Sequence, residues 1–174
     1  MVVDQNLHEL DNPVGIDLRI QEIQNYLYSG IKEWNLEAFG RAELIGNRLT
    51  LFSKEREYID ALVINESKSN GRFFFIDSEK TIERFSQLET EVTVVFLLNL
   101  EKVYKERKHR LDEEARIKVL ELLKCKGLED LRVVKGQSVL KGYETSLIDM
   151  QPYHFMSFTF DLNYSIHNNH YFKN

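Results

Sequence analysis

The end of the chain carries a run of alternating side chains that restricts the fold more than any other feature. Over residues 153–164 (YHFMSFTFDLNY) successive side chains fall on two faces. One face carries His154, Met156, Phe158, Phe160, Leu162 and Tyr164, and the other carries Tyr153, Phe155, Ser157, Thr159, Asp161 and Asn163. Because side chains alternate across a strand, this pattern predicts one long β-strand with a core face and a second face that becomes polar towards its end. The chain must therefore build a sheet.

A second run shows where the middle of that sheet lies. Residues 92–98 (VTVVFLL) are apolar on both faces and β-branched at the start. Such a run is typical of a central strand that is covered on both sides. The chain also holds 11 Phe and 8 Tyr but only 2 Pro, a composition that favours long strands over loops. We therefore expect residues 92–98 at the centre of the sheet.

The segment before these strands has a different spacing of apolar residues. From residue 16 the apolar positions fall three or four apart, at Ile16, Ile20, Ile23, Leu27, Ile31 and Trp34. This spacing predicts a helix of about five turns with one face on the core. Residues 1–15 lack a period and end in Asn-Pro and Gly, so we expect an extended arm there, of the kind that often orders only on a neighbouring molecule.

Two hairpins are expected in the half that follows the helix. Residues 39–45 and 48–52 flank the turn-forming pair Gly46-Asn47. Residues 58–64 and 72–76 are separated by a polar stretch that is too long for a two-residue turn. We expect this connecting loop to project from the domain.

Beyond the central strand, the sequence predicts a second helix. Asp112 is a candidate N-cap, and Gly127 is a candidate for the left-handed residue that ends the helix. Residues 131–134 and 138–143 then suggest a short β pair. The fold class is therefore α+β, a mainly antiparallel sheet packed against a long N-terminal helix and a second helix, with a protruding loop or hairpin. At 174 residues we expect an arm (1–15), a single domain (16–166) and a tail (167–174).

No motif specifies a chemistry. The glycines form no phosphate-binding loop, and no nucleophile-elbow pattern occurs. His167 and His170 lie in the polar tail without further ligands at metal-binding spacing. Three acidic residues stand at the start of the second predicted helix, namely Asp112, Glu113 and Glu114. Their favourable interaction with the helix dipole explains them more simply than a role in acid-base catalysis does. We therefore expect no enzyme, and no catalytic, cofactor-binding or metal-binding residues.

Composition bears on location and partners. The lone cysteine, Cys125, lies in an apolar helical run and is expected in the core, which suits a reducing compartment. No stretch resembles a leader or a membrane span. The net charge of -5 disfavours general attraction to nucleic acid. Residues 102–110 (KVYKERKHR) form the one basic cluster, where Glu101 and Glu106 are expected to neutralise much of the charge.

Two aromatic residues are candidates for a subunit interface. Tyr153 and Phe155 lie on the face of the last strand opposite its main apolar row. A helix of the same chain would cover them in the simpler interpretation. Burial against another subunit is the alternative, since exposed aromatic clusters mark interfaces.

Three segments carry a resemblance to a known family. They are the helix DLRIQEIQNYLYSGIKEW, the strand TVVFLLNL leading into EARIKVLELL, and the ending QPYHFMSFTFDLNY. In the order of its elements, over about residues 16–166, the chain resembles the small tail-completion and tail-terminator proteins of tailed bacteriophages. It is similar also to neck-ring proteins of crAss-like gut phages.

The resemblance implies assembly and carries over no catalytic residue and no cofactor. It implies a homo-oligomeric ring, hexameric or dodecameric, that joins the capsid portal to the tail and lets DNA pass. The partners would be portal, connector or tail-tube proteins, the location a virion assembled in the host cytoplasm, and no membrane would be involved. An acidic chain suits a lumen that repels phosphate. A head-to-tail ring needs two different patches per subunit, and we expect the arm and residues 65–71 to carry one of them.

Two other classes of function stay open at this point. One is a small cytosolic ligand-binding or enzymatic α/β domain with a site built from scattered residues, which a pocket with convergent polar groups would favour. The other is an adaptor that binds nucleic acid through residues 102–110. A rimmed apolar patch would instead favour the ring protein.

Overall fold

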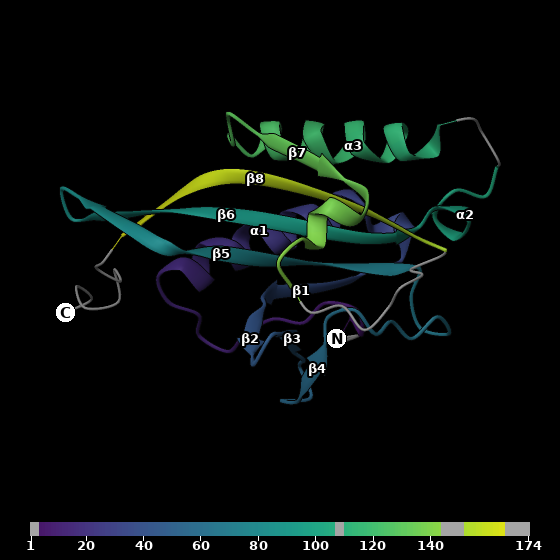
Figure 1. Cartoon of the computed structure of the whole chain (residues 1–174), viewed down its shortest axis with the longest axis horizontal. Helices are drawn as coiled ribbons and strands as arrows, with labels where there is room; N and C mark the ends of the chain where they lie inside the picture. The colour runs from purple at the N-terminus through teal and green to yellow at the C-terminus, as the bar shows by residue number, and fades with distance from the viewer. Residues whose placement is uncertain (1–3, 107–109, 144–151, 166–174) are drawn as a thin grey trace.

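The chain folds into two sheets and two long helices (Figure 1). The computed structural model describes residues 4–106, 110–143 and 152–165. The large sheet has the order β1 (Glu37–Arg41), β5 (Gly71–Arg84), β6 (Gln87–Asn99), β8 (Tyr153–Ser165) and β7 (Arg132–Lys135). The small sheet is formed by β2 (Glu43–Ile45), β3 (Arg48–Phe52) and β4 (Tyr58–Asp60). Among the strands of the described residues, β1 and β5 pair in parallel and the other pairs are antiparallel, which confirms a mainly antiparallel α+β fold.

The large sheet is covered on both faces. On one face, α1 (Ile16–Gly30) and α3 (Leu111–Cys125) pack against the residues of β6 and β8 that alternate inwards. On the other face, the small sheet and the short helix η2 (Gly136–Leu140) form a second apolar cluster. Two further short helices, η1 (Lys32–Trp34) and α2 (Leu100–Val103), lie beside each other. The predicted central strand and the predicted last strand are both confirmed, as β6 and β8.

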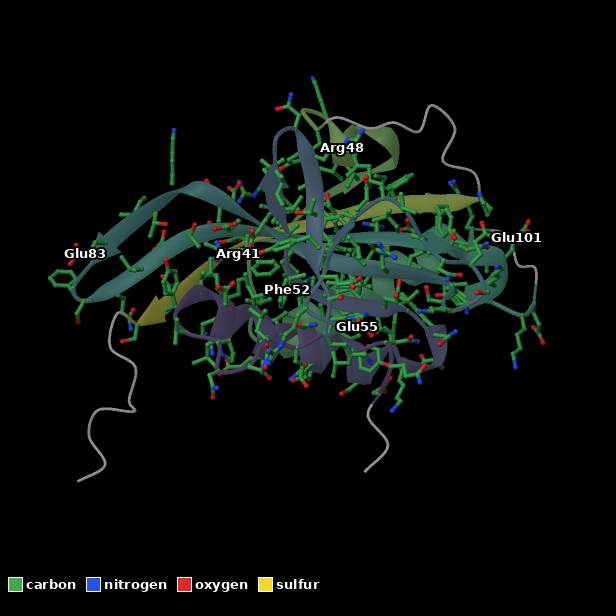
Figure 2. All side chains as sticks on the ribbon, turned by 90° about the horizontal axis from the view of Figure 1, so that it is seen from below. Arg41, Arg48, Phe52, Glu55, Glu83 and Glu101 are labelled. Carbon is green, nitrogen blue, oxygen red and sulfur yellow. The ribbon has the colours of Figure 1, made fainter. Side chains whose placement is uncertain are left out.

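A long hairpin of β5 and β6 organises the sheet. The two strands pair from Gly71 with Leu98 to Arg84 with Gln87, and the turn between them is formed by Phe85 and Ser86. Its far end extends beyond the helices at the left of Figure 1. Glu83 at this end and Glu101 in α2 lie at opposite ends of the molecule (Figure 2). The hairpin is therefore the protruding element of the fold.

This pairing corrects the second predicted hairpin. β4 pairs with β3 and not with residues 72–76, which belong to β5. Three consecutive side chains of β5, Phe73, Phe74 and Phe75, are fully buried. A segment that is apolar on both faces needs a packed layer on each face of its sheet, and the large sheet supplies both, with Phe73 and Phe75 in one cluster and Phe74 in the other.

Other local predictions have mixed outcomes. The hairpin around Gly46 is confirmed as β2 and β3, although Phe39 belongs to β1 of the large sheet. The predicted pair of 131–134 with 138–143 is wrong, because β7 pairs with β8 and residues 136–140 form η2.

The limits of α3 differ in part from those predicted. Gly127 does adopt a left-handed φ of 85° after α3. Asp112 lies inside the first turn, where no side chain caps the helix. Cys125 is exposed, not in the core, because it falls on the outer side of the last turn of α3.

The described part of the arm packs on its own chain. Leu7 forms a parallel bridge with Ala38 of β1, and His8 is buried. The amide of His8 donates to the carbonyl of Ala38, and the amide of Ala38 donates to the carbonyl of Asn6. Residues 4–10 are therefore ordered without a neighbouring molecule. The predicted tail, with His167 and His170, lies outside the described residues, as do residues 107–109 of the basic cluster.

Candidate functional site

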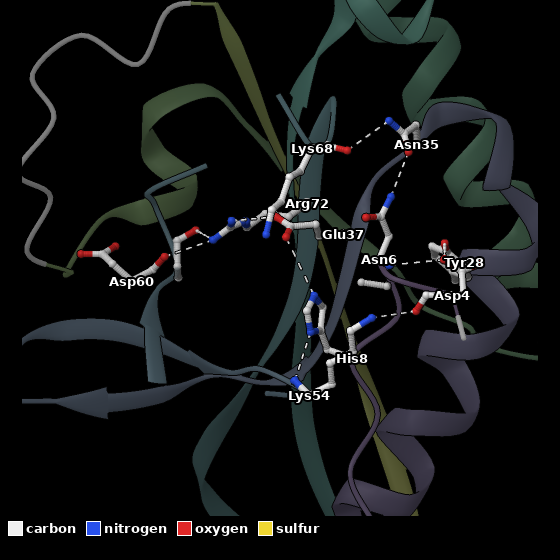
Figure 3. Close-up of polar contacts among 12 residues, drawn as sticks. Asp4, Asn6, His8, Tyr28, Asn35, Glu37, Lys54, Asp60, Lys68 and Arg72 are labelled. Carbon is white, nitrogen blue, oxygen red and sulfur yellow. Dashed lines mark hydrogen bonds and ion pairs between the residues drawn. The ribbon is translucent and has the colours of Figure 1, made fainter. Parts of the chain in front are cut away.

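A buried polar network lies where the arm crosses the sheet (Figure 3). The arm supplies His8, β1 supplies Glu37 and β5 supplies Arg72. Their exposed fractions are 7%, 8% and 2%, so three ionisable side chains share one interior site. Charged groups are rarely buried unless they are paired, so the partners of each decide what the site does.

Arg72 is held by a carboxylate and by backbone carbonyls. Its Nη2 donates to Oε2 of Glu37 at 2.7 Å, and its Nη1 donates to the carbonyl of Asp60 at 3.1 Å. The guanidinium also lies over the ring of Phe39, 5.3 Å from the ring centre. Burial lowers the pKa of Arg72, and the charge of Glu37 opposes this shift. Arg72 therefore ties β5 to β1 and to the end of β4.

His8 is oriented by stacking and by one hydrogen bond. Its ring stacks on Phe39 with 4.0 Å between ring centres and 5° between planes. Its Nδ1 accepts from the backbone N–H of Lys54 at 3.2 Å, so in a neutral ring Nε2 carries the proton. That Nε2 lies 3.9 Å from Oε1 of Glu37, beyond hydrogen-bond distance. His8 thus directs a buried N–H towards the Glu37 carboxylate without bonding to it.

An open cleft of about 840 Å³ borders this network, and we call it the arm cleft. It is lined by Gln5, Asn6, His8, Glu37, Ser53, Lys54, Glu55, Glu57, Ile59, Ser67 and Lys68. Burial alone would raise the pKa of Glu37, but His8 and Arg72 lower it below the ordinary value. Glu37 is therefore ionised and pairs with Arg72, while the Nε2 of His8 faces its other oxygen at 3.9 Å. The described contacts of this network join the arm, β1, β4, β5 and the turn that follows β3, which gives it a clear structural role.

A second notable site is the free end of the β5–β6 hairpin. Residues 80–87, here the hairpin tip, are exposed throughout. Phe85 is 100% exposed, and Ile82 is also largely exposed. Both turn residues have positive φ, 50° at Phe85 and 66° at Ser86, the backbone geometry that closes a two-residue turn. The turn thus presents a large apolar ring to solvent at the end of a rigid ribbon.

The candidate interface residues lie inside the chain's own second cluster. Phe155 is buried there together with Leu62 and Leu140, and Tyr153 packs against the same cluster. The small sheet, its connection to β5 and the short helix η2 cover them, so the cover comes from the same chain, as in the simpler interpretation, but a helix is only part of it. Burial raises the pKa of the Tyr153 hydroxyl. This pair therefore carries no argument for subunit contact.

The described part of the basic cluster is dispersed. Lys102 forms an ion pair with Glu66, with 3.5 Å between Nζ and Oε2. Arg110 immediately precedes α3 and is exposed. The nucleic-acid hypothesis for residues 102–110 therefore stays a prediction.

Sequence reasoning missed both the buried network and the hairpin tip. His8 lies in a segment without a period, and Glu37 and Arg72 each adjoin an apolar run whose partner is far away in sequence. Phe85 did leave a signal, since it is a lone aromatic in the polar stretch EKTIERFSQLE. The pairing of β5 with β6 was needed to show that Phe85 lies at an exposed hairpin tip.

Comparisons with known proteins add no family. No protein-family model matches the chain, and no curated protein matches it significantly. Within residues 4–106, 110–143 and 152–165, three or more His, Cys, Asp or Glu side chains nowhere gather as metal ligands, and no helix is long and apolar enough to cross a membrane. Any functional assignment therefore comes from the residues of the chain itself.

Proposed function

We propose that the protein is a structural subunit that assembles with copies of itself into a closed ring at the neck or tail end of a phage particle. The ring would join the capsid portal to the tail and leave a passage for DNA. The observation that carries the proposal is the fully exposed ring of Phe85 at the hairpin tip. Aromatic residues are enriched in the cores of interfaces, and the ring of Phe85 has its whole apolar surface free for a partner.

The hairpin is built to present this ring rigidly. Its near half lies in the middle of the large sheet, where Phe73, Phe75 and Phe96 are fully buried. Pairing continues without interruption from Thr81 with Thr90 to the turn, and β8 pairs with β6 as far as Gln87. A tip supported by three strands loses little conformational entropy on binding, so more of its contact energy appears as affinity.

Two further observations support a ring that passes DNA. The chain has a net charge of -5, which favours a lumen that repels the phosphates of a sliding duplex. The chain also has the order of elements on which the resemblance to tail-completion and neck-ring proteins rests, although its protruding element is the β5–β6 hairpin and not the expected loop of residues 65–71. The proposal needs no cofactor and no catalytic residue.

The test is the mass of the purified protein over a concentration series, measured by light scattering, with negative-stain images of the same samples. We expect a rising mass that levels off at a fixed multiple of 20.6 kDa, and closed rings in the images. A mass of 20.6 kDa at every concentration, with no rings, would contradict self-assembly of this chain. Open filaments in place of rings would contradict closure.

A further inference from the structure

A buried donor and a carboxylate oxygen face each other in the arm cleft without forming a bond. The protonated Nε2 of His8 lies 3.9 Å from Oε1 of Glu37, which is too far for a hydrogen bond (Figure 3). Among the described residues this Nε2 has no hydrogen-bond partner, although the His8 side chain is only 6% exposed. A buried polar group without a partner costs free energy, so the gap between the two atoms is suited to a group that bonds to both.

The cleft beside this gap is polar and large enough for a small molecule. Both His8 and Glu37 line it, and apart from Ile59 its lining consists of amide, hydroxyl, imidazole and charged side chains. Its volume of about 840 Å³ falls in the range of small-molecule sites. The ammonium group of Lys54 donates to the carbonyl of Asp4 at 3.0 Å, so this charge is already engaged. A ligand would therefore be held mainly by hydrogen bonds.

The chemistry of the two facing atoms restricts the group that fits between them. The Nε2–H of His8 can only donate, and the ionised carboxylate of Glu37 can only accept. A phosphate or carboxylate would be repelled by Glu37, and an ammonium group would leave the N–H of His8 unpaired. A metal ion needs a free lone pair on the ring nitrogen, but Nε2 carries the proton because Nδ1 accepts from the N–H of Lys54. A hydroxyl group accepts one hydrogen bond and donates another, so it satisfies both atoms.

We infer that the arm cleft binds a neutral saccharide, one hydroxyl of which accepts from Nε2 of His8 and donates to Oε1 of Glu37. A saccharide fits better than a simple alcohol because the lining offers further donors and acceptors to its other hydroxyls, among them Gln5, Asn6 and Glu57. The site lies within one chain and goes beyond the proposed ring function. A chain that forms rings but binds no saccharide contradicts this inference alone, and a monomer that binds one contradicts the ring alone.

Saturation-transfer difference NMR on the full chain tests the site, because it detects weakly bound small molecules on monomers and on large assemblies. The probes are the methyl glycosides of glucose, galactose, mannose and N-acetylglucosamine at millimolar concentration. Dimethyl phosphate and methylammonium serve as an anion that only accepts and a cation that only donates. We expect transfer to at least one glycoside and none to the two ions. No transfer to any glycoside, or stronger transfer to either ion, overturns the inference.

The variant Ser67→Trp tests whether the glycoside sits in the arm cleft. Ser67 is exposed and lines the cleft, so a large ring there obstructs the cleft and leaves His8 and Glu37 in the chain. Ser29→Trp is the matched control, because Ser29 is an exposed residue of α1 outside the lining. We expect the dissociation constant of the glycoside to rise at least about tenfold in Ser67→Trp and to change less than about twofold in the control. Equal affinities in the two variants overturn the inference.

The variant His8→Phe tests the facing pair of atoms itself. Phenylalanine can keep the stacking on Phe39 and removes both ring nitrogens. With a circular dichroism spectrum like that of the wild type, we expect the glycoside to bind at least about tenfold more weakly, and unchanged binding overturns the inference. If this variant does not fold, a crystal structure of the wild type with the glycoside decides. We expect a sugar hydroxyl within hydrogen-bond distance of Nε2 of His8 and Oε1 of Glu37, whereas a water molecule at that place overturns the inference.

Discussion

Arg72, Glu37 and His8 show at the residue scale how one interior site joins three segments. Arg72 is 2% exposed and pairs with Glu37, while His8 directs its Nε2 towards the same carboxylate. Removing one member of a buried pair leaves the other charge desolvated and uncompensated, which costs more than the pair itself contributes. The contribution of each of these residues to the free energy of unfolding therefore depends on the presence of the others.

Replacing Glu37 by Gln should lower the free energy of unfolding by about 3 kcal/mol at neutral pH, because Arg72 then stays buried without its counter-ion. The pKa of Glu37 is lowered in the folded state from its ordinary value of 4.5. The carboxylate therefore contributes stability that is fully present above that ordinary value and is lost as the pH falls through the lower folded pKa. Urea unfolding at neutral pH and at about pH 3 should show the difference from wild type shrinking in acid.

The control for this prediction is Glu83→Gln at the exposed hairpin tip. It should change the free energy of unfolding by less than about 0.5 kcal/mol at both pH values. A Glu37→Gln loss that is equally large in acid would mean that the ionised carboxylate is not the cause.

At the scale of elements, the β5–β6 hairpin depends on a close approach at its start. Phe73 and Phe75 point to the cluster under the helices, and Phe74 points to the cluster under the small sheet. These buried side chains place β5 tightly against β6. Gly71 begins the strand with a φ of 145°, and a methyl group added there would lie 2.0 Å from the carbonyl oxygen of Leu97.

Gly71→Ala should therefore destabilise the protein by more than about 2 kcal/mol, because either the backbone of β5 or that of β6 has to move. Gly127→Ala is the matched control. Gly127 also has a positive φ, 85°, but a methyl group there meets nothing within 4 Å, so we expect a cost of about 1 kcal/mol. Urea unfolding of both variants measures the difference, and equal costs would rule out the clash with Leu97.

At the scale of the whole molecule, the arm is part of the domain. Asn6 and His8 exchange backbone hydrogen bonds with Ala38 at 2.8 and 2.9 Å. The side chain of Gln24 on α1 donates to the carbonyl oxygens of His8 and Ala38 at 2.8 and 2.9 Å. The arm is thereby fastened to α1 and β1.

Deleting residues 1–12 should lower the free energy of unfolding by about 3 kcal/mol, since several buried hydrogen bonds and the cover over Phe39 are lost. Hydrogen exchange at the amide of Ala38 should accelerate strongly, because its acceptor is the carbonyl of Asn6. Unchanged protection of the Ala38 amide would contradict the docked arm.

Elements that show a regular spacing of apolar residues along their own segment could be predicted from the sequence. The alternation of apolar and polar side chains predicted β8, and a run of residues that is apolar on both faces predicted β6. Apolar residues spaced three or four apart predicted α1. Burial imposes these periods on any strand or helix, so they are visible before the partners are known. The same reasoning placed the left-handed Gly127, since a residue without Cβ adopts positive φ at low cost.

The pairing of the strands, and the side chains exposed at their turns, became known from the tertiary structure. The partner of β5 depends on which neighbours bury Phe73, Phe74 and Phe75, and these neighbours lie far away in sequence. The turn at Phe85 and Ser86 has two non-glycine residues with positive φ, so no turn signature marks it, and the pairing of the strands imposes it. The meeting of His8, Glu37 and Arg72 follows from the same long-range pairing, because contacts between distant segments leave no period in the sequence.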